Sequence, residues 1–157
     1  MKTFLSILTI LFFANISASA QDFEIKDGLA LDKSGRLFSG HVTTKYESGQ
    51  TKEELEYYKG KKHGAFITFD ENGLMIEKGY FEDGEKNGAW NKWNAAGFLV
   101  SSVYFNNGQK DGKWQIWDDN GNLRYVMYYQ NGLKAGNWKM YDENGTVTQE
   151  QSYSASL

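Results

Sequence analysis

Glycine recurs in this sequence at a fixed interval of 24 residues, and no other feature restricts the possible folds as strongly. The interval appears in three series: Gly40, Gly64, Gly88, Gly112 and Gly136; Gly49, Gly73, Gly97, Gly121 and Gly145; and Gly60, Gly84, Gly108 and Gly132. Together these series contain 14 of the 17 glycines. Periods of about 20 to 50 residues are typical of repeat architectures, whose units stack on one another to bury a continuous core. We therefore predict a repeat array over residues 40–153, with about five units, the last truncated.

Aromatic side chains keep the same interval in three columns. The first column is Val42, Phe66, Trp90, Trp114 and Trp138; the second is Lys45, Phe69, Trp93, Trp117 and Tyr141; the third is Tyr57, Phe81, Phe105, Tyr129 and Tyr153. All five tryptophans fall in the first two columns. Trp90 and Trp93 are three residues apart, so a regular strand would place them on opposite faces unless a bulge realigns them. The sequence leaves both arrangements open, namely aromatics on both faces or a bulge near the start of the repeat.

Turn residues separate short apolar runs within each period. Asn-Gly pairs, the strongest short-range hairpin signal, end at Gly73, Gly88, Gly108, Gly121, Gly132 and Gly145. The runs between turns are five to eight residues long and rich in Trp, Tyr, Phe, Val and Ile, as strands are. In one of them, residues 123–129, large apolar or aromatic side chains occupy every second position, which is the period of a strand. The predicted fold class is all-β: an elongated antiparallel β-meander of 24-residue hairpin repeats, each advancing by about 10 Å.

The first twenty residues differ in character from the array. A positively charged start precedes an apolar run of eleven residues (4–14), and Ala18-Ser19-Ala20 ends the segment with small side chains. This layout is typical of a secretory signal peptide, cleaved before Gln21. An uncleaved membrane anchor is the alternative, but an anchor needs about 20 apolar residues to cross a bilayer. We predict a signal peptide at residues 1–20, no transmembrane anchor, and a periplasmic or extracellular location after cleavage.

One repeat unit reads Gly-x-Trp/Phe-x-x-Trp/Tyr/Phe-Asp/Asn-x-x-Gly, then an apolar strand, then Tyr-Phe/Tyr-x-x-Gly-x-Lys-x-Gly. It is plain in residues 64–88, 88–112 and 112–136, and Lys45 breaks it in the first copy. The pattern resembles the MORN-variant repeat family, which includes the YwqK-type proteins labelled antitoxins of toxin–antitoxin systems. The resemblance covers about residues 29–153 and implies an elongated meander and an antitoxin-like role. It leaves a degenerate N-terminal cap at residues 21–39 and a tail at residues 154–157, since terminal repeats tend to be atypical.

Composition and spacing exclude several functional classes. The chain has no cysteine, so disulfides, thiolate metal sites and a cysteine nucleophile are ruled out. An isoelectric point of about 5.4 and a net charge of -3 argue against nucleic-acid binding, which needs a surplus of Lys and Arg. The two histidines, His41 and His63, share no metal-binding spacing, and we expect His63 to be an exposed turn residue. We predict no nucleic-acid partner, no cofactor, no metal ion and no enzymatic activity.

Two classes of function remain after these exclusions. The first is a protein-interaction module, in which exposed aromatics bind another protein. The second is an envelope glycan- or lipid-binding module, in which a row of aromatics stacks on sugar rings or charged turns meet lipid. The candidate binding surface is Trp90, Trp93, Trp114, Trp117, Trp138 and Tyr141. Lysines are expected along one edge of the array, at Lys62, Lys86, Lys110 and Lys134, and acidic turns along the other, at Asp70, Glu71, Asp118, Asp119, Asp142 and Glu143.

Overall fold

Every regular element in the described part of the chain is a β-strand, which confirms the predicted all-β fold class. The computed structural model describes residues 17–19 and 23–154. The strands are β1 (Ser17–Ser19), β2 (Phe23–Lys26), β3 (Leu29–Asp32), β4 (Gly40–Lys45), β5 (Thr51–Tyr58), β6 (Lys61–Phe69), β7 (Met75–Glu82), β8 (Glu85–Trp93), β9 (Leu99–Asn106), β10 (Gln109–Trp117), β11 (Leu123–Gln130), β12 (Leu133–Tyr141) and β13 (Val147–Tyr153). Aromatic and β-branched side chains fill many of these strands because they pack well on a pleated surface.

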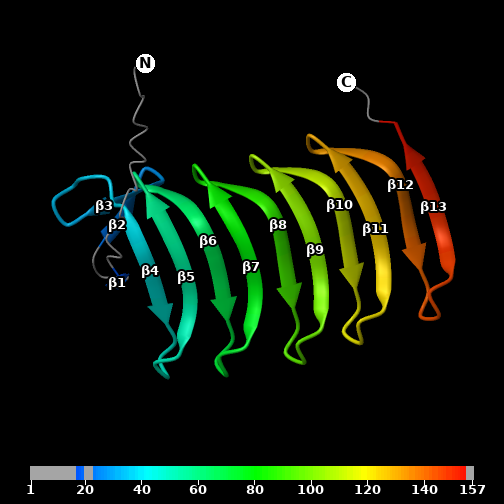
Figure 1. The fold of residues 1–157 in the computed structure, drawn as a ribbon, viewed down its shortest axis with the longest axis horizontal. Coiled ribbons are helices and arrows are strands. Elements are labelled where there is room, and N and C mark those ends of the chain that lie inside the picture. Colours follow the sequence, from blue (N-terminus) through cyan, green and yellow to red (C-terminus); the bar gives the residue numbers. More distant parts are fainter. Residues whose placement is uncertain (1–16, 20–22, 155–157) are drawn as a thin grey trace, which may run out of the picture.

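Strands β4 to β13 form one open antiparallel meander, in which each strand pairs with the next strand along the chain. Figure 1 shows these strands side by side in an elongated array, as predicted from the 24-residue period. Strand β1 pairs in parallel with β4, while β2 and β3 form a separate two-stranded sheet. β1 lies within the predicted signal peptide; residues 1–16 and 20 of that segment lie outside the described residues, as do residues 155–157 of the predicted tail.

Two-residue turns connect the strands along one edge of the array. Asn107 and Gly108 both have positive φ, 47° and 77°, and a turn with two such residues matches the twist of the strands on either side. Equivalent turns are Lys59-Gly60, Asp83-Gly84 and Asn131-Gly132. The backbone N–H of Gly108 also donates a hydrogen bond to the carbonyl oxygen of Lys86 in the preceding repeat (2.8 Å). Each turn is therefore fixed to the turn before it.

Five-residue loops connect the strands along the other edge. In the loop 118–122, the Asp118 carboxylate accepts hydrogen bonds from the backbone N–H groups of Asn120 (3.0 Å) and Asn122 (2.9 Å). Aspartate and asparagine favour such turns because their side chains bond the backbone two residues on. The N-terminal segment repeats this chemistry, since Asp32 accepts from the N–H groups of Ser34 and Arg36. The segment from Asp32 to Arg36 is therefore a loop of the same kind as the five-residue loops of the array.

A β-bulge lies at the start of every repeat from Gly64 onward. Opposite Val103 of β9, strand β10 carries three residues, Gly112 to Trp114. Gly112 has a φ of 60° inside the strand, which glycine adopts without the steric penalty of other residues. The same interruption occurs at Gly64, Gly88 and Gly136. Five of the six Asn-Gly pairs lie in turns as predicted, but Asn87-Gly88 lies in a strand, because this glycine forms the bulge.

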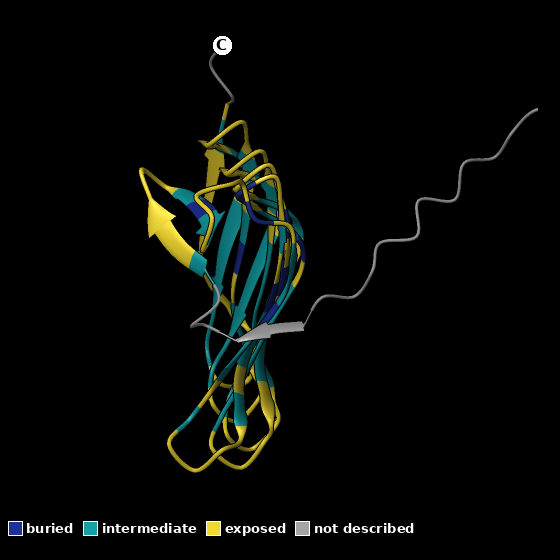
Figure 2. Ribbon diagram, turned by 90° about the vertical axis from the view of Figure 1, so that its left-hand side faces the viewer, coloured by how far each residue is buried: buried dark blue, intermediate teal, exposed yellow. Residues whose placement is uncertain are grey.

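The buried core is small and lies mainly in the N-terminal half of the array. One cluster joins Ala30, Phe38 and Val42, and a second joins Leu55, Phe81 and Trp90. The β2–β3 hairpin covers the first cluster: the rings of Phe23 and Phe38 stack 5.2 Å apart, and both contact Tyr57. Figure 2 views the sheet along the array, with exposed turns at both ends of the strands. A single sheet with so little covering material leaves much of its surface open to solvent.

Candidate binding surfaces

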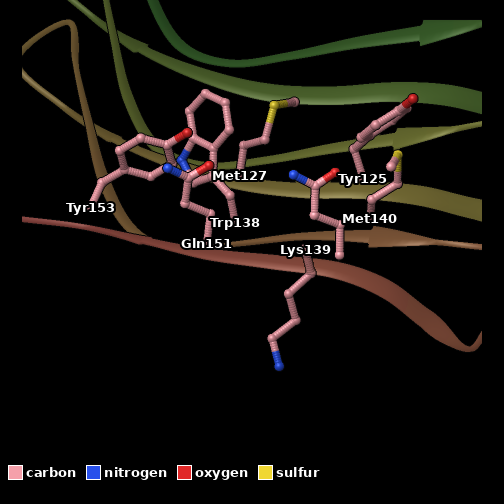
Figure 3. A pocket seen from close by; sticks show the side chains of 8 residues that line it. Tyr125, Met127, Trp138, Lys139, Met140, Gln151 and Tyr153 are labelled. Atoms are coloured by element: carbon pink, nitrogen blue, oxygen red, sulfur yellow. The ribbon is translucent and has the colours of Figure 1, made fainter.

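The first two aromatic columns lie on opposite faces of the sheet. Strand β12 pairs regularly with β13 from Gly136 to Met140, so side chains alternate between the faces along it. Figure 3 shows Trp138 and Met140 on one side of β12 and Lys139 pointing away from them, while Tyr141 lines a trough on the side of Lys139. The bulge precedes Trp138 and does not bring the columns together. Of the two arrangements that the sequence left open, the structure has aromatics on both faces as well as a bulge.

A continuous row of rings crosses the face that carries the first column, which we name the ladder face. The row is Phe66, Phe81, Trp90, Phe105, Trp114, Tyr129, Trp138 and Tyr153. Centroids of neighbouring rings lie between 4.9 and 6.4 Å apart, in tilted or edge-to-face arrangements. Such arrangements add about 0.5–1.5 kcal/mol per pair beyond the area that the rings bury. The ladder therefore holds successive repeats together without disulfides.

Each ladder tryptophan is also anchored at the bulge. The indole N–H of Trp114 donates a hydrogen bond to the carbonyl oxygen of Tyr104 (2.9 Å), and Trp138 donates in the same way to Tyr128 (2.9 Å). Trp90 makes the equivalent bond to Tyr80 (3.2 Å). The accepting residue stands where the bulge interrupts the strand ladder, and the bond satisfies a carbonyl there. Tryptophan at this position therefore packs in the ladder and also hydrogen-bonds the backbone of the neighbouring strand.

The recurrent lysines reach across the ladder face rather than standing free at the array edge. The ammonium group of Lys134 lies 4.5 Å from the ring centroid of Trp138 and 5.0 Å from that of Tyr153. The ammonium group of Lys110 lies 4.7 Å from the ring centroid of Trp114, and that of Lys86 lies 3.6 Å from the ring centroid of Trp90. Burial lowers the pKa of Lys86, an effect that the neighbouring carboxylate of Glu77 opposes. These contacts are cation–π interactions, which are favourable even at exposed sites.

The C-terminal half of the ladder face carries an uncovered apolar surface, which we name the open patch. It consists of Trp114, Ile116, Tyr125, Met127, Trp138, Met140 and Tyr153, none of which is buried. Tyr125 is 42% exposed. A shallow depression of about 210 Å³ lies within the patch (Figure 3), lined by Tyr125, Met127, Trp138 and Met140 among others. By contrast, Trp90 in the N-terminal half is only 2% exposed.

The six residues predicted from the sequence therefore do not form one surface. Trp90, Trp114 and Trp138 belong to the ladder face, while Trp93, Trp117 and Tyr141 are half-buried on the opposite face. Five members of the open patch were absent from the predicted set, namely Tyr125, Met127, Ile116, Met140 and Tyr153. For the first two, the alternation of apolar residues along 123–129 was the available signal.

The structure places His63 differently from the position predicted from the sequence. His63 lies inside β6 and is half-buried, with its ring between those of Tyr58 and Tyr80, so the prediction of an exposed turn residue is wrong. Because the adjacent glycine Gly64 forms a bulge and not a turn, this position belongs to β6. Among the described residues, no three His, Asp or Glu side chains are grouped as metal ligands would be. No helix in residues 17–19 and 23–154 has the length and apolar character needed to cross a membrane.

The repeat family matches the part of the chain that carries the open patch. The MORN repeat variant family matches residues 110–131 and 134–155. No curated protein matches the sequence. Among solved structures, a crystal structure of accessory secretory protein 1, 2 and 3 in Streptococcus pneumoniae is similar, with a TM-score of 0.36 and 16% identity. The similarity covers 76% of this chain but only 21% of that one, so this chain spans about a fifth of its length.

The two matched segments each contain, in the order predicted from the sequence, a recurrent lysine, a bulge glycine, a ladder tryptophan, a loop glycine and a second ladder aromatic. The resemblance drawn from the 24-residue pattern is therefore confirmed by the family match. Residues 110–131 and 134–155 are therefore two adjacent copies that match the MORN repeat variant.

Proposed function

We propose that this chain is an exported, non-catalytic repeat protein that binds another protein through the open patch. The supporting observation is the contrast along the ladder face. Phe23 of the β2–β3 hairpin and Phe38, which follows the hairpin, cover its N-terminal end. The rings and methionines of the open patch are covered by no other described element. A contiguous exposed apolar surface on a soluble chain is a recurrent mark of a protein-interaction site.

The chemistry of the open patch suits a protein surface better than a sugar. Aromatic residues and methionine are enriched in the cores of protein interfaces, where flexible methionine adapts to the partner. Sugar stacking needs a free ring face, and the rings of Trp114 and Trp138 already carry a lysine ammonium group and neighbouring rings. The family resemblance implies an antitoxin-like role. An exported protein would not meet a cytoplasmic toxin, so this proposal includes that role only for a toxin that acts in the envelope.

The proposal is tested with a matched pair of substitutions on one strand. Ile116→Lys places a charge in the open patch, whereas Gln115→Lys places the same charge on the opposite face one residue away. The purified chain is immobilised and exposed to envelope and secreted proteins of its host, and captured proteins are identified by mass spectrometry. We expect Ile116→Lys to lose a captured partner and Gln115→Lys to keep it, with both variants folded by circular dichroism. Equal capture by both variants, or no capture by the unchanged chain, contradicts the proposal.

A further inference from the structure

The face opposite the ladder carries a second set of aromatics that the ladder does not use. One row is Tyr80, Tyr104 and Tyr128, spaced 24 residues apart, and the other row is Trp93, Trp117 and Tyr141. Each tyrosine pairs across the sheet with a residue of the next strand, and Tyr104 and Tyr128 are 44% and 37% exposed. Because two strands advance by about 10 Å, aromatic rings of one row recur at that distance along the array.

Tyr104 and Tyr128 differ from the ladder rings in having one side free. A Cβ atom built on the bulge glycine Gly112 would lie 3.6–3.8 Å from atoms of Tyr104, and one built on Gly136 would lie 3.3–3.6 Å from atoms of Tyr128. Each tyrosine therefore packs beside the glycine of the neighbouring strand, an arrangement that shields exposed glycine backbone in sheets. No aromatic ring or lysine ammonium group in the described residues packs against either ring, in contrast to Trp114 and Trp138. These two rings can accept a further partner without losing an existing contact.

Polar and basic side chains lie between the two aromatic rows. A shallow trough of about 640 Å³ crosses β10 to β12 on this face, with Tyr128 and Tyr141 among its lining residues and Val126 as its buried floor. Its hydrogen-bonding groups are the amides of Gln115 and Asn137 and the ammonium groups of Lys113 and Lys139. Lys139 is paired with Glu150 (3.4 Å), whereas Lys113 is exposed and forms no ion pair with any described residue. The trough lining contains no carboxylate, so Lys113 gives it a positive charge that no described ion pair balances; outside the trough, Asp111 pairs across the sheet with Tyr104.

We infer that this face binds a linear acidic polysaccharide lying across the strands, with sugar rings against Tyr104 and Tyr128 and a sugar carboxylate near Lys113. A repeat spacing of about 10 Å is close to the length of one disaccharide unit in an extended β-1,4-linked chain. Tyr104 and Tyr128 therefore stand at the spacing of successive disaccharides, and Lys113 lies on the strand between them, opposite Tyr128. The free ring faces supply apolar stacking, the amides supply hydrogen bonds, and the unpaired lysine supplies charge complementarity, which contributes specificity and speeds association.

This inference concerns a different surface from the open patch, so the two proposals fail independently. The probe is a β-1,4-linked mannuronate hexamer, with cellohexaose as the neutral sugar of the same linkage and polyglutamate as an acidic chain without sugar rings. Binding to the purified full chain is measured by isothermal titration calorimetry in dilute buffer and again with added salt. We expect the mannuronate hexamer to bind, cellohexaose to bind more weakly, and salt to weaken the mannuronate complex because exposed charges are screened.

A matched pair of tyrosines on one strand provides the decisive variants. Tyr128→Ala removes a ring from the opposite face, while Tyr125→Ala removes a similarly exposed ring from the open patch. We expect Tyr128→Ala to weaken mannuronate binding about three- to tenfold, the effect of losing one stacked aromatic, and Tyr125→Ala to leave it unchanged. Lys113→Gln, at an exposed position, should weaken the complex and reduce its salt dependence. Tyr128→Phe, which keeps the ring, should retain most of the affinity.

Three results would overturn the inference. The first is the absence of mannuronate binding, and the second is equal binding of polyglutamate with no effect of Tyr128→Ala, which would show simple charge attraction. The third is an equal loss of affinity in Tyr125→Ala and Tyr128→Ala at unchanged thermal stability. The capture experiment with the open patch is repeated with Tyr128→Ala. If this variant captures as much protein as the unchanged chain, protein binding does not depend on the polysaccharide site.

Discussion

The indole ring of Trp90 lies directly against the backbone of Gly79 on the preceding strand, with no room for a side chain between them. The equivalent residues in the next two repeats are Val103 and Met127, which both carry side chains at this position. This difference explains why Trp90 is 2% exposed and Trp114 and Trp138 are not buried. Gly79 therefore allows the Trp90 ring to pack closely on the neighbouring strand.

Replacing Gly79 with alanine should destabilise the fold through this contact. Gly79 has no positive φ, so backbone strain does not contribute, and the new methyl group must overlap the Trp90 ring. Overpacking of this kind costs about 1–3 kcal/mol in the free energy of unfolding, measurable by urea denaturation. The control is Gly79→Ala combined with Trp90→Leu, in which the smaller side chain should relieve most of that cost. An undiminished cost in the double variant would assign the effect to another cause.

The hydrogen bond at the bulge should make Trp114 contribute more to the stability of the fold than Trp117 does. Trp114→Phe removes the indole donor to the Tyr104 carbonyl, while the indole N–H of Trp117 has no hydrogen-bond partner among the described residues. Trp117→Phe is therefore a matched control for the loss of ring size. We expect Trp114→Phe to reduce the free energy of unfolding by about 1 kcal/mol more than the control. Equal losses in denaturant melts would show that the bond contributes nothing to stability.

The loop at Asp118 should make stability depend on pH in the acid range. Backbone hydrogen bonding from Asn122 is the main cause that lowers the pKa of Asp118 below its ordinary value of 3.8, and a similar bond from Arg36 lowers that of Asp32. Since the folded-state pKa lies below the unfolded one, the stabilisation is complete above 3.8 and is lost as the pH falls through the folded-state pKa.

The variant Asp118→Asn isolates this contribution, because asparagine keeps an oxygen acceptor for the loop N–H groups but does not titrate. We expect the melting temperature of the unchanged chain to fall more steeply than that of Asp118→Asn as the pH is lowered from about 5 to about 2. Parallel curves for the two proteins would contradict this assignment. Asp32 and Asp118 are both partly exposed to solvent, so the effect is a difference in slope rather than a large loss of stability.

Local sequence features were sufficient to predict the meander but not its faces. The two-residue turn at Asn107-Gly108 and the loop beginning at Asp118 follow from turn chemistry within a few residues, so the strand order could be derived without tertiary information. Asn87-Gly88 has the same local chemistry as a turn and yet lies in β8. Its role as a bulge depends on pairing with the neighbouring strand, which the dipeptide itself does not specify.

The sequence by itself determined the repeat period, the all-β meander and the recurrence of aromatics and lysines, because these depend on residues within one 24-residue unit. Only the tertiary structure decided that Trp138 and Tyr141 face opposite sides, that Lys134 lies over the Trp138 ring, and that Trp90 is buried while its counterparts are open. Those outcomes depend on what the neighbouring strand places beneath each ring and on where the β2–β3 hairpin ends. Such contacts join residues from different repeats, so no single repeat encodes them.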